Sequence, residues 1–124
     1  MTRLRYNDIL SKFLEIRTYQ VQGHERTNLS CGQIEVDEVY VGIDGANKFI
    51  IPISGKGGDK DCLSYTQALN LSNYALEKKR YQGYVGRPLG VAKQSDGTIF
   101  VVEFNCVKRI HDLEIVRVGA FKFA

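Results

Sequence analysis

The sequence of 124 residues predicts a single domain of mixed α/β (α+β) class, with a central mixed β-sheet flanked by helices. Three observations support this class. Two segments have apolar residues at helical spacing, and several others are rich in Val, Ile and Tyr or alternate between apolar and polar residues. Turn signals, Asp44-Gly45 and Asp96-Gly97, separate neighbouring strands.

The first predicted helix runs from about Asp8 to Arg17. Asn7 or Asp8 can cap it, and apolar residues follow at helical spacing, namely Ile9, Leu10, Phe13, Leu14 and Ile16. The next segment is polar and broken by glycine, with one short strand near Tyr19 to Gln22. We therefore expect a helix followed by an irregular stretch.

A β-hairpin is predicted next, and it contains most of the acidic residues discussed below. Its first strand spans Gln33 to Ile43, and its second spans Lys48 to Ile53 in antiparallel orientation. Pro52 has no amide hydrogen, so it indicates an edge strand or a local bulge.

The second half of the chain predicts one more helix and three more strands. The helix runs from about Asp61 to Lys79, with Asp61 placed to cap it. Strands are expected at Pro88 to Lys93 and at Thr98 to Phe104, and a final alternating strand at Leu113 to Phe123. This order predicts a sheet with a helix on either face.

Composition and charge exclude several classes of protein. The net charge of +3 permits an anionic partner without requiring one. The three cysteines are scattered without a CxxC pair, which is typical of reduced thiols in a cytoplasmic protein: Cys31, Cys62 and Cys106. No apolar run has the length of about 18 residues that a membrane span needs, and no signal peptide is recognisable.

The predicted hairpin concentrates charge where its two strands meet. Glu35, Asp37 and Glu38 lie in the first strand, and Lys56 follows the second. One interpretation is that these are surface charges paired with lysines, which contribute little to stability. The other is that the hairpin brings Asp37 beside Lys56, where a carboxylate and a lysine could hold a divalent metal and a scissile phosphate.

A family resemblance supports the second interpretation. The stretch QIEVDEVYVGID…FIIPISGK, followed by a helix that carries Gln67, resembles the PD-(D/E)XK nuclease superfamily of restriction-endonuclease-like proteins. The resemblance implies an αβββαβ core and a metal-dependent DNA endonuclease that hydrolyses phosphodiester bonds with Mg²⁺ or Mn²⁺. It further implies DNA as partner and a homodimer or a partner subunit. Because the chain opens directly into its first predicted helix, we expect it to be the catalytic part of a larger protein.

The resemblance assigns a role to six residues. Asp37 matches the metal-binding acid, Lys56 matches the motif lysine, and the carbonyl of Gly55 would be a further metal ligand. Gln67 matches the helix residue that contacts the site, and Glu35 would be an additional catalytic and metal-binding acid, with Glu38 as a supporting acid.

One position departs from the motif, because Ser54 stands where the family has Glu or Asp. A neutral hydroxyl is a poor replacement for a carboxylate as a Mg²⁺ ligand. Three explanations stay open. The acid has moved to Glu35 or Asp61, the chain is a catalytically inactive DNA-binding or assembly module on the same fold, or the hairpin only shares charged ends with the family.

Two polar loops are candidates for contact with the DNA backbone. GKGGDK carries Lys60 between a predicted strand and a predicted helix, and its alternative role is a flexible connector. QGHERT carries His24 and Arg26, and its alternative role is a solvated loop.

Overall fold

The computed structural model describes residues 6–57 and 64–122, with the backbone alone at 6, 7, 56 and 57. Within these residues, two α-helices, two short 3₁₀ helices and nine strands follow one another in this order: α1 (Tyr6–Leu14), β1 (Arg17–Gln22), β2 (Glu25–Leu29), β3 (Gly32–Val36), β4 (Glu38–Asp44), β5 (Asn47–Gly57), α2 (Tyr65–Glu77), η1 (Lys79–Tyr81), β6 (Val85–Gly86), β7 (Leu89–Lys93), β8 (Thr98–Phe104), η2 (Ile110–Asp112) and β9 (Ile115–Lys122).

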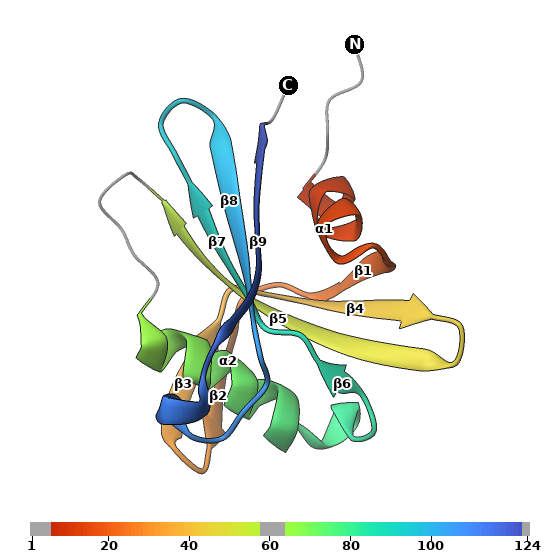
Figure 1. Cartoon of the computed structure of the whole chain (residues 1–124). Helices are drawn as coiled ribbons and strands as arrows, with labels where there is room; N and C mark the ends of the chain where they lie inside the picture. Colours follow the sequence, from red (N-terminus) through yellow and green to blue (C-terminus); the bar gives the residue numbers. More distant parts are fainter. Residues whose placement is uncertain (1–5, 58–63, 123–124) are drawn as a thin grey trace.

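The main sheet is mixed, as the sequence predicts. Its strands lie in the order β1-β4-β5-β7-β8-β9, with β6 paired to β5 (Figure 1). β5 and β7 are parallel, and the other neighbours along this path are antiparallel. Without the β2–β3 ribbon, the short helix η1 and the two-residue strand β6, the first elements read α1-β1-β4-β5-α2-β7, which is an αβββαβ order.

Each helix covers one face of the sheet, because alternate residues of the central strands point to opposite sides. On the α1 side, Ile9 and Leu10 of the helix pack with Tyr40 of β4 and Ile51 of β5. On the α2 side, the core joins the helix to β3, β4 and β5 through Leu71, Tyr74, Ile34, Val36, Val39 and Ile50. The predicted arrangement of a sheet between helices is therefore confirmed.

The predicted strand from Gln33 to Ile43 is divided in the structure. Asp37 lies in a bend between β3 and β4, and β3 pairs with β2 in a separate two-stranded ribbon. The sequence prediction missed β2 because its inward positions include a charged residue, Glu25, which is only 9% exposed. Lys78 and Arg80 hold this carboxylate at 2.8 and 3.2 Å, so its burial depends on partners more than 50 residues away in the chain.

The prediction for Pro52 was wrong, since β5 is an internal strand and its pairing with β4 has no bulge. On its other side, β5 pairs with β6 up to Ile50 and with β7 from Ile53 onward. Pro52 therefore lies where the neighbouring strand changes, a position at which the sheet does not require an amide hydrogen.

Both helices end earlier than the sequence predicts. α1 ends at Leu14 because Glu15 takes a left-handed conformation with a φ of 60°. α2 begins at Tyr65 with Ser64 as its N-cap, and Asp61, the predicted cap, lies outside the described residues. Ser64 and Gln67 form a capping box, which provides partners for amides that a helix start leaves unpaired.

Candidate functional site

The candidate site forms where β4 ends against the longer strand β5. The first residue of β4, Glu38, is opposite Ile53, whereas β5 continues to Gly57. The amide of Asp37 donates to the carbonyl of Ile53 at 3.0 Å, and the chain then bends away into the ribbon. β5 therefore has backbone groups beyond Ile53 that β4 does not reach.

The side chain of Asp37 occupies this gap. Its Oδ2 accepts a hydrogen bond from the amide of Gly55 at 2.6 Å, in the place of a strand carbonyl. The amide and carbonyl of one strand residue point to the same side, so the carbonyl of Gly55 faces the gap as well. The bend thus places one carboxylate, from Asp37, beside one backbone carbonyl of β5 that faces the gap.

Gly55 has no side chain, but the approach of Asp37 to its amide does not depend on this. A Cβ at this position would lie 3.8 Å from Oδ2 of Asp37 and 3.9 Å from the carbonyl oxygen of Val91. These are ordinary contact distances, so the glycine leaves space beside the carboxylate without being sterically required.

Lys56 follows Gly55 directly and lies opposite Ala92 of β7. The backbone thus places the predicted lysine one residue beyond the amide that binds Asp37. Ser54, on the other side of Gly55, is opposite Gly90 and is 8% exposed. The three residues of the predicted motif therefore line one stretch of β5, next to the bend.

Glu38 adds a second carboxylate to this region. Its Oε2 is buried and has no hydrogen-bond partner among the described residues. Burial raises the pKa of the Glu38 carboxyl, the positive charge of Lys93 opposes this rise, and the negative charge of Asp37 adds to it. Burial also raises the pKa of Tyr40, the next residue on the same side of β4, to about 12, and the Glu38 charge contributes.

An unpaired buried carboxylate oxygen is costly, which distinguishes Glu38 from an ordinary surface acid. The sequence indicated Glu38 only as a supporting acid. Its neighbours in the sequence carry no signal of its burial, because the residues near it include Ile53 of β5 and Lys93 of β7, which lie far from it in the chain.

Glu35, predicted as an additional catalytic and metal-binding acid, is placed on the ribbon with two of the predicted DNA-binding residues. Its carboxylate lies 2.7 Å from Nη2 of Arg26 and 3.4 Å from Nε2 of His24. The hydrogen bond with His24, followed by the charge of Arg26, lowers the pKa of Glu35. All three side chains are exposed, and these contacts of the Glu35 carboxylate are with Arg26 and His24 of this region rather than with Asp37.

Gln67, predicted to contact the site, is engaged at the start of α2. Its Oε1 accepts from the amide of Ser64 at 3.1 Å and from the Ser64 hydroxyl at 3.4 Å. The capping box thus engages the side-chain oxygen of Gln67. Lys60, predicted to contact DNA, and Asp61, a candidate for the displaced acid, lie outside the described residues.

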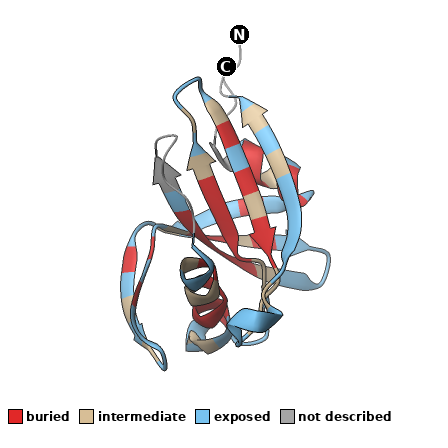
Figure 2. Cartoon of the chain, turned by 60° about the vertical axis from the view of Figure 1, so that its left-hand side comes forward, coloured by how far each residue is buried: buried red, intermediate tan, exposed pale blue. Residues whose placement is uncertain are grey.

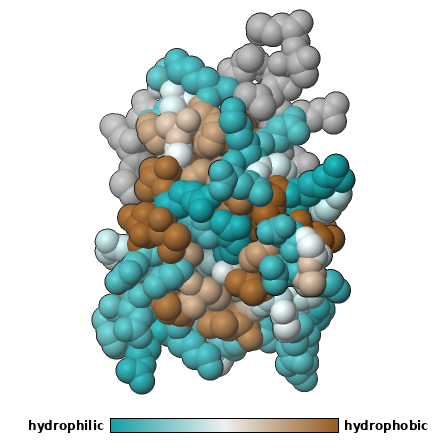
Figure 3. Space-filling model, turned by 45° about the vertical axis from the view of Figure 1, so that its right-hand side comes forward, coloured by the Kyte–Doolittle hydropathy of each residue, from teal (hydrophilic) through white to brown (hydrophobic). Residues whose placement is uncertain are grey.

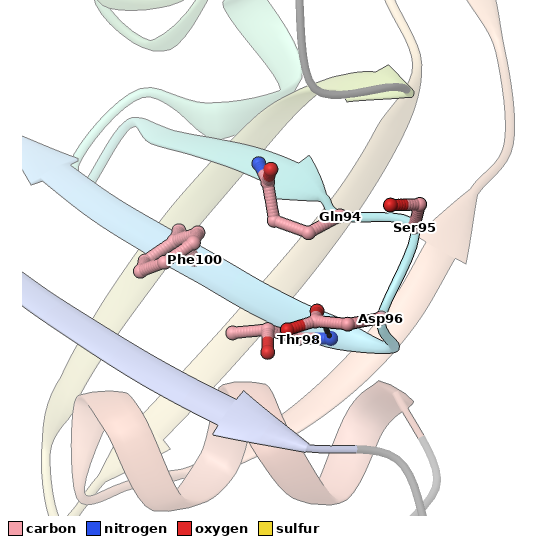
Figure 4. Close-up of a pocket in the computed structure, with 5 residues that line it drawn as sticks. All are labelled: Gln94, Ser95, Asp96, Thr98 and Phe100. Atoms are coloured by element: carbon pink, nitrogen blue, oxygen red, sulfur yellow. Dashed lines mark hydrogen bonds between the residues drawn. The ribbon is translucent and has the colours of Figure 1, made fainter.

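A hollow of about 280 Å³ lies elsewhere, at the turn between β7 and β8. Figure 4 shows the residues that line it: Gln94, Ser95, Asp96, Thr98 and Phe100. The Asp96 carboxylate accepts a hydrogen bond from the amide of Thr98 at 2.9 Å, which closes the turn and lowers the pKa of Asp96. The hollow is thus explained by the hairpin turn and contains none of the predicted site residues.

Within residues 8–55 and 64–122, no three His, Cys, Asp or Glu side chains are grouped closely enough to hold a metal ion among themselves. Likewise, no helix in the described part of the chain is long and apolar enough to cross a membrane. Comparisons with protein-family models, with curated proteins and with solved structures gave no match.

Proposed function

We propose that this chain is a metal-dependent DNA endonuclease domain of the PD-(D/E)XK type, which hydrolyses phosphodiester bonds. The observation that carries the proposal is the hydrogen bond of 2.6 Å between Asp37 and the amide of Gly55, one residue before Lys56. It supports the juxtaposition of acid and lysine that such chemistry requires. The αβββαβ order of the core elements agrees with it.

The donors at the bend suit a hard divalent cation. Mg²⁺ and Mn²⁺ prefer oxygen ligands, and the carboxylate of Asp37 and the carbonyl of Gly55 are both oxygens at the same gap. The unpartnered buried Oε2 of Glu38 fits a third ligand, since a cation would compensate the cost of its burial. Glu38 would then provide the second carboxylate that Ser54 cannot.

In this proposal each residue of the chain has a distinct task. Asp37 and Glu38 hold the cation, which when bound would polarise a phosphoryl oxygen and acidify a water molecule. Lys56 positions the attacking water or the phosphate through its positive charge. Lys60 and the exposed side chains of His24 and Arg26 are proposed to contact the DNA backbone.

The proposal is tested by incubating plasmid DNA with the protein and Mg²⁺ or Mn²⁺. We expect nicking or linearisation by the wild type, and a rate at least about 100-fold lower for Asp37→Ala, Lys56→Ala and Glu38→Gln. Asp96→Asn serves as the matched control, because this acid lies in the β7–β8 turn and should leave the rate unchanged. Cleavage that survives in Asp37→Ala would contradict the proposal.

A second function is favoured by one observation, the neutral and buried Ser54 at the position of the motif acid. A catalytically inactive DNA-binding or assembly module on the same fold would retain the charged loops and lose the chemistry. Such a module would bind DNA with an affinity that falls steeply with salt, and it would not cleave DNA. Ser54→Glu separates the two cases further, since a rise in cleavage would show that the site has lost its acid at this position.

A further inference from the structure

Strand β9 leaves an open edge with apolar side chains in solvent. It is the last strand of the main sheet, and most of its residues are exposed (Figure 2). Large apolar side chains also reach the surface in other places (Figure 3). On β9, however, three such side chains lie close together on one strand: Ile115, Val116 and Val118 are 55%, 57% and 61% exposed.

The opposite face of β9 is already held in place by α1. The rings of Phe13 and Phe121 pack edge to face with centroids 6.2 Å apart, and Nη1 of Arg117 donates to the carbonyl of Phe13 at 2.9 Å. A Cβ at Gly119 would lie 2.8 Å from the Phe13 ring, so helix and strand are in close contact there. Contacts with α1 therefore hold β9 in place within the single chain.

An ordered, apolar edge strand favours association with another chain. Its backbone groups can hydrogen-bond to a further strand, and its apolar side chains can pack against that strand. The other edge of the sheet carries the more polar β1, with the sequence RTYQVQ. The irregular pairing between Glu103 and Phe104 of β8 and the start of β9, together with Lys122 at its end, limits indiscriminate pairing. These features favour one specific partner.

We propose that the partner is a second copy of this chain, with the two β9 strands antiparallel around a two-fold axis at Val118. In this arrangement Val118 of one copy faces Val118 of the other, so the most exposed apolar residue of the strand covers itself. Glu114, the residue before β9, would then lie opposite Lys122, the last residue of β9 in the other copy, and both side chains are exposed. Opposite charges at matching cross-strand positions stabilise such a pair.

The dimer would extend the sheet continuously through both copies, with α1 of each copy on one side. The backbone edge would be paired along β9, and Val118 would lose part of its contact with water against its copy. The inference depends on the edge strand alone, and it holds whether or not the chain cleaves DNA.

The test is sedimentation velocity of the full chain between about 1 and 100 µM, a range that covers moderate dimer affinities. We expect a dimer for the wild type and a dissociation constant at least about tenfold higher for Val118→Lys, which places like charges opposite each other. Val85→Lys is the matched control, because Val85 of β6 is 53% exposed and lies away from β9. A monomer at all concentrations, or equal effects of both substitutions, would overturn the proposal.

Two charge-complementation experiments distinguish a lost interface from a folding defect. Mixing Val118→Lys with Val118→Glu should restore a dimer that neither variant forms alone, since the introduced charges meet at the axis. Glu114→Lys and Lys122→Glu should each weaken the dimer, and the double variant should regain affinity within about threefold of the wild type. Recovery in neither the mixture nor the double variant would refute the register centred on Val118.

Discussion

Replacement of Glu38 by methionine should make the protein more stable. The buried Oε2 of Glu38 has no partner among the described residues, and an unsatisfied buried acceptor costs about 1–3 kcal/mol. Methionine keeps a similar volume beside Ile53 and Tyr40 without a polar atom. We therefore expect Glu38→Met to raise the free energy of unfolding by about 1–3 kcal/mol at pH 7 without divalent cations.

The pH dependence of this gain follows from the raised pKa of Glu38. Above its ordinary value of 4.5, the unfolded chain releases the proton while the folded chain retains it, so stability decreases as the pH rises towards the folded pKa. The advantage of Glu38→Met should thus be smallest below about pH 4, increase as the pH rises through the folded pKa, and be constant beyond it.

Thermal and urea unfolding between pH 3 and pH 8 measure this effect. A gain of 1 kcal/mol corresponds to a rise in Tm of about 3–5 °C for a chain of this length. Glu15→Met is the control, because the Glu15 side chain is 82% exposed, and it should change the free energy by less than about 0.5 kcal/mol.

Divalent cations connect this measurement with the proposed function. Mg²⁺ or Mn²⁺ should stabilise the wild type through binding to the folded state, and it should stabilise Glu38→Met much less. A variant that is less stable than the wild type at pH 7, or a gain in stability that does not depend on pH, would refute the reasoning that burial of the Glu38 carboxylate destabilises the fold.

Two further predictions concern the contacts that hold the fold. Arg87 and Glu103 form a mostly buried ion pair with Nε–Oε2 and Nη2–Oε1 distances of 2.8 and 3.0 Å, so Glu103→Leu alone should lower the free energy of unfolding in urea by about 3–5 kcal/mol. Adding Arg87→Met should recover most of that loss, and a double variant as unstable as the single one would contradict this. Gly119→Ala should destabilise by about 1–3 kcal/mol through contact with Phe13. Gly23→Ala, whose added Cβ would have no atom of the described residues within 4 Å, should be nearly neutral in the same assay.

Local patterns were sufficient to predict much of the candidate site. The charged hairpin indicated that Asp37 and the end of β5 lie together, and the structure places Asp37 against Gly55. The same patterns could not show that Glu35 is bound by His24 and Arg26, because β2 was not recognised as a strand. Pairing between two polar strands leaves little trace in hydrophobic alternation.

The sequence by itself determined the class of fold, the positions of the central strands and the helix on each face. These features follow from apolar periodicity and turn residues, which act over a few neighbouring positions. The tertiary structure alone decided the bend at Asp37, the burial of one oxygen of Glu38 and the exposed edge of β9. Each of these depends on which distant segments exclude water from a residue, and that is a property of the packed chain rather than of its neighbours in sequence.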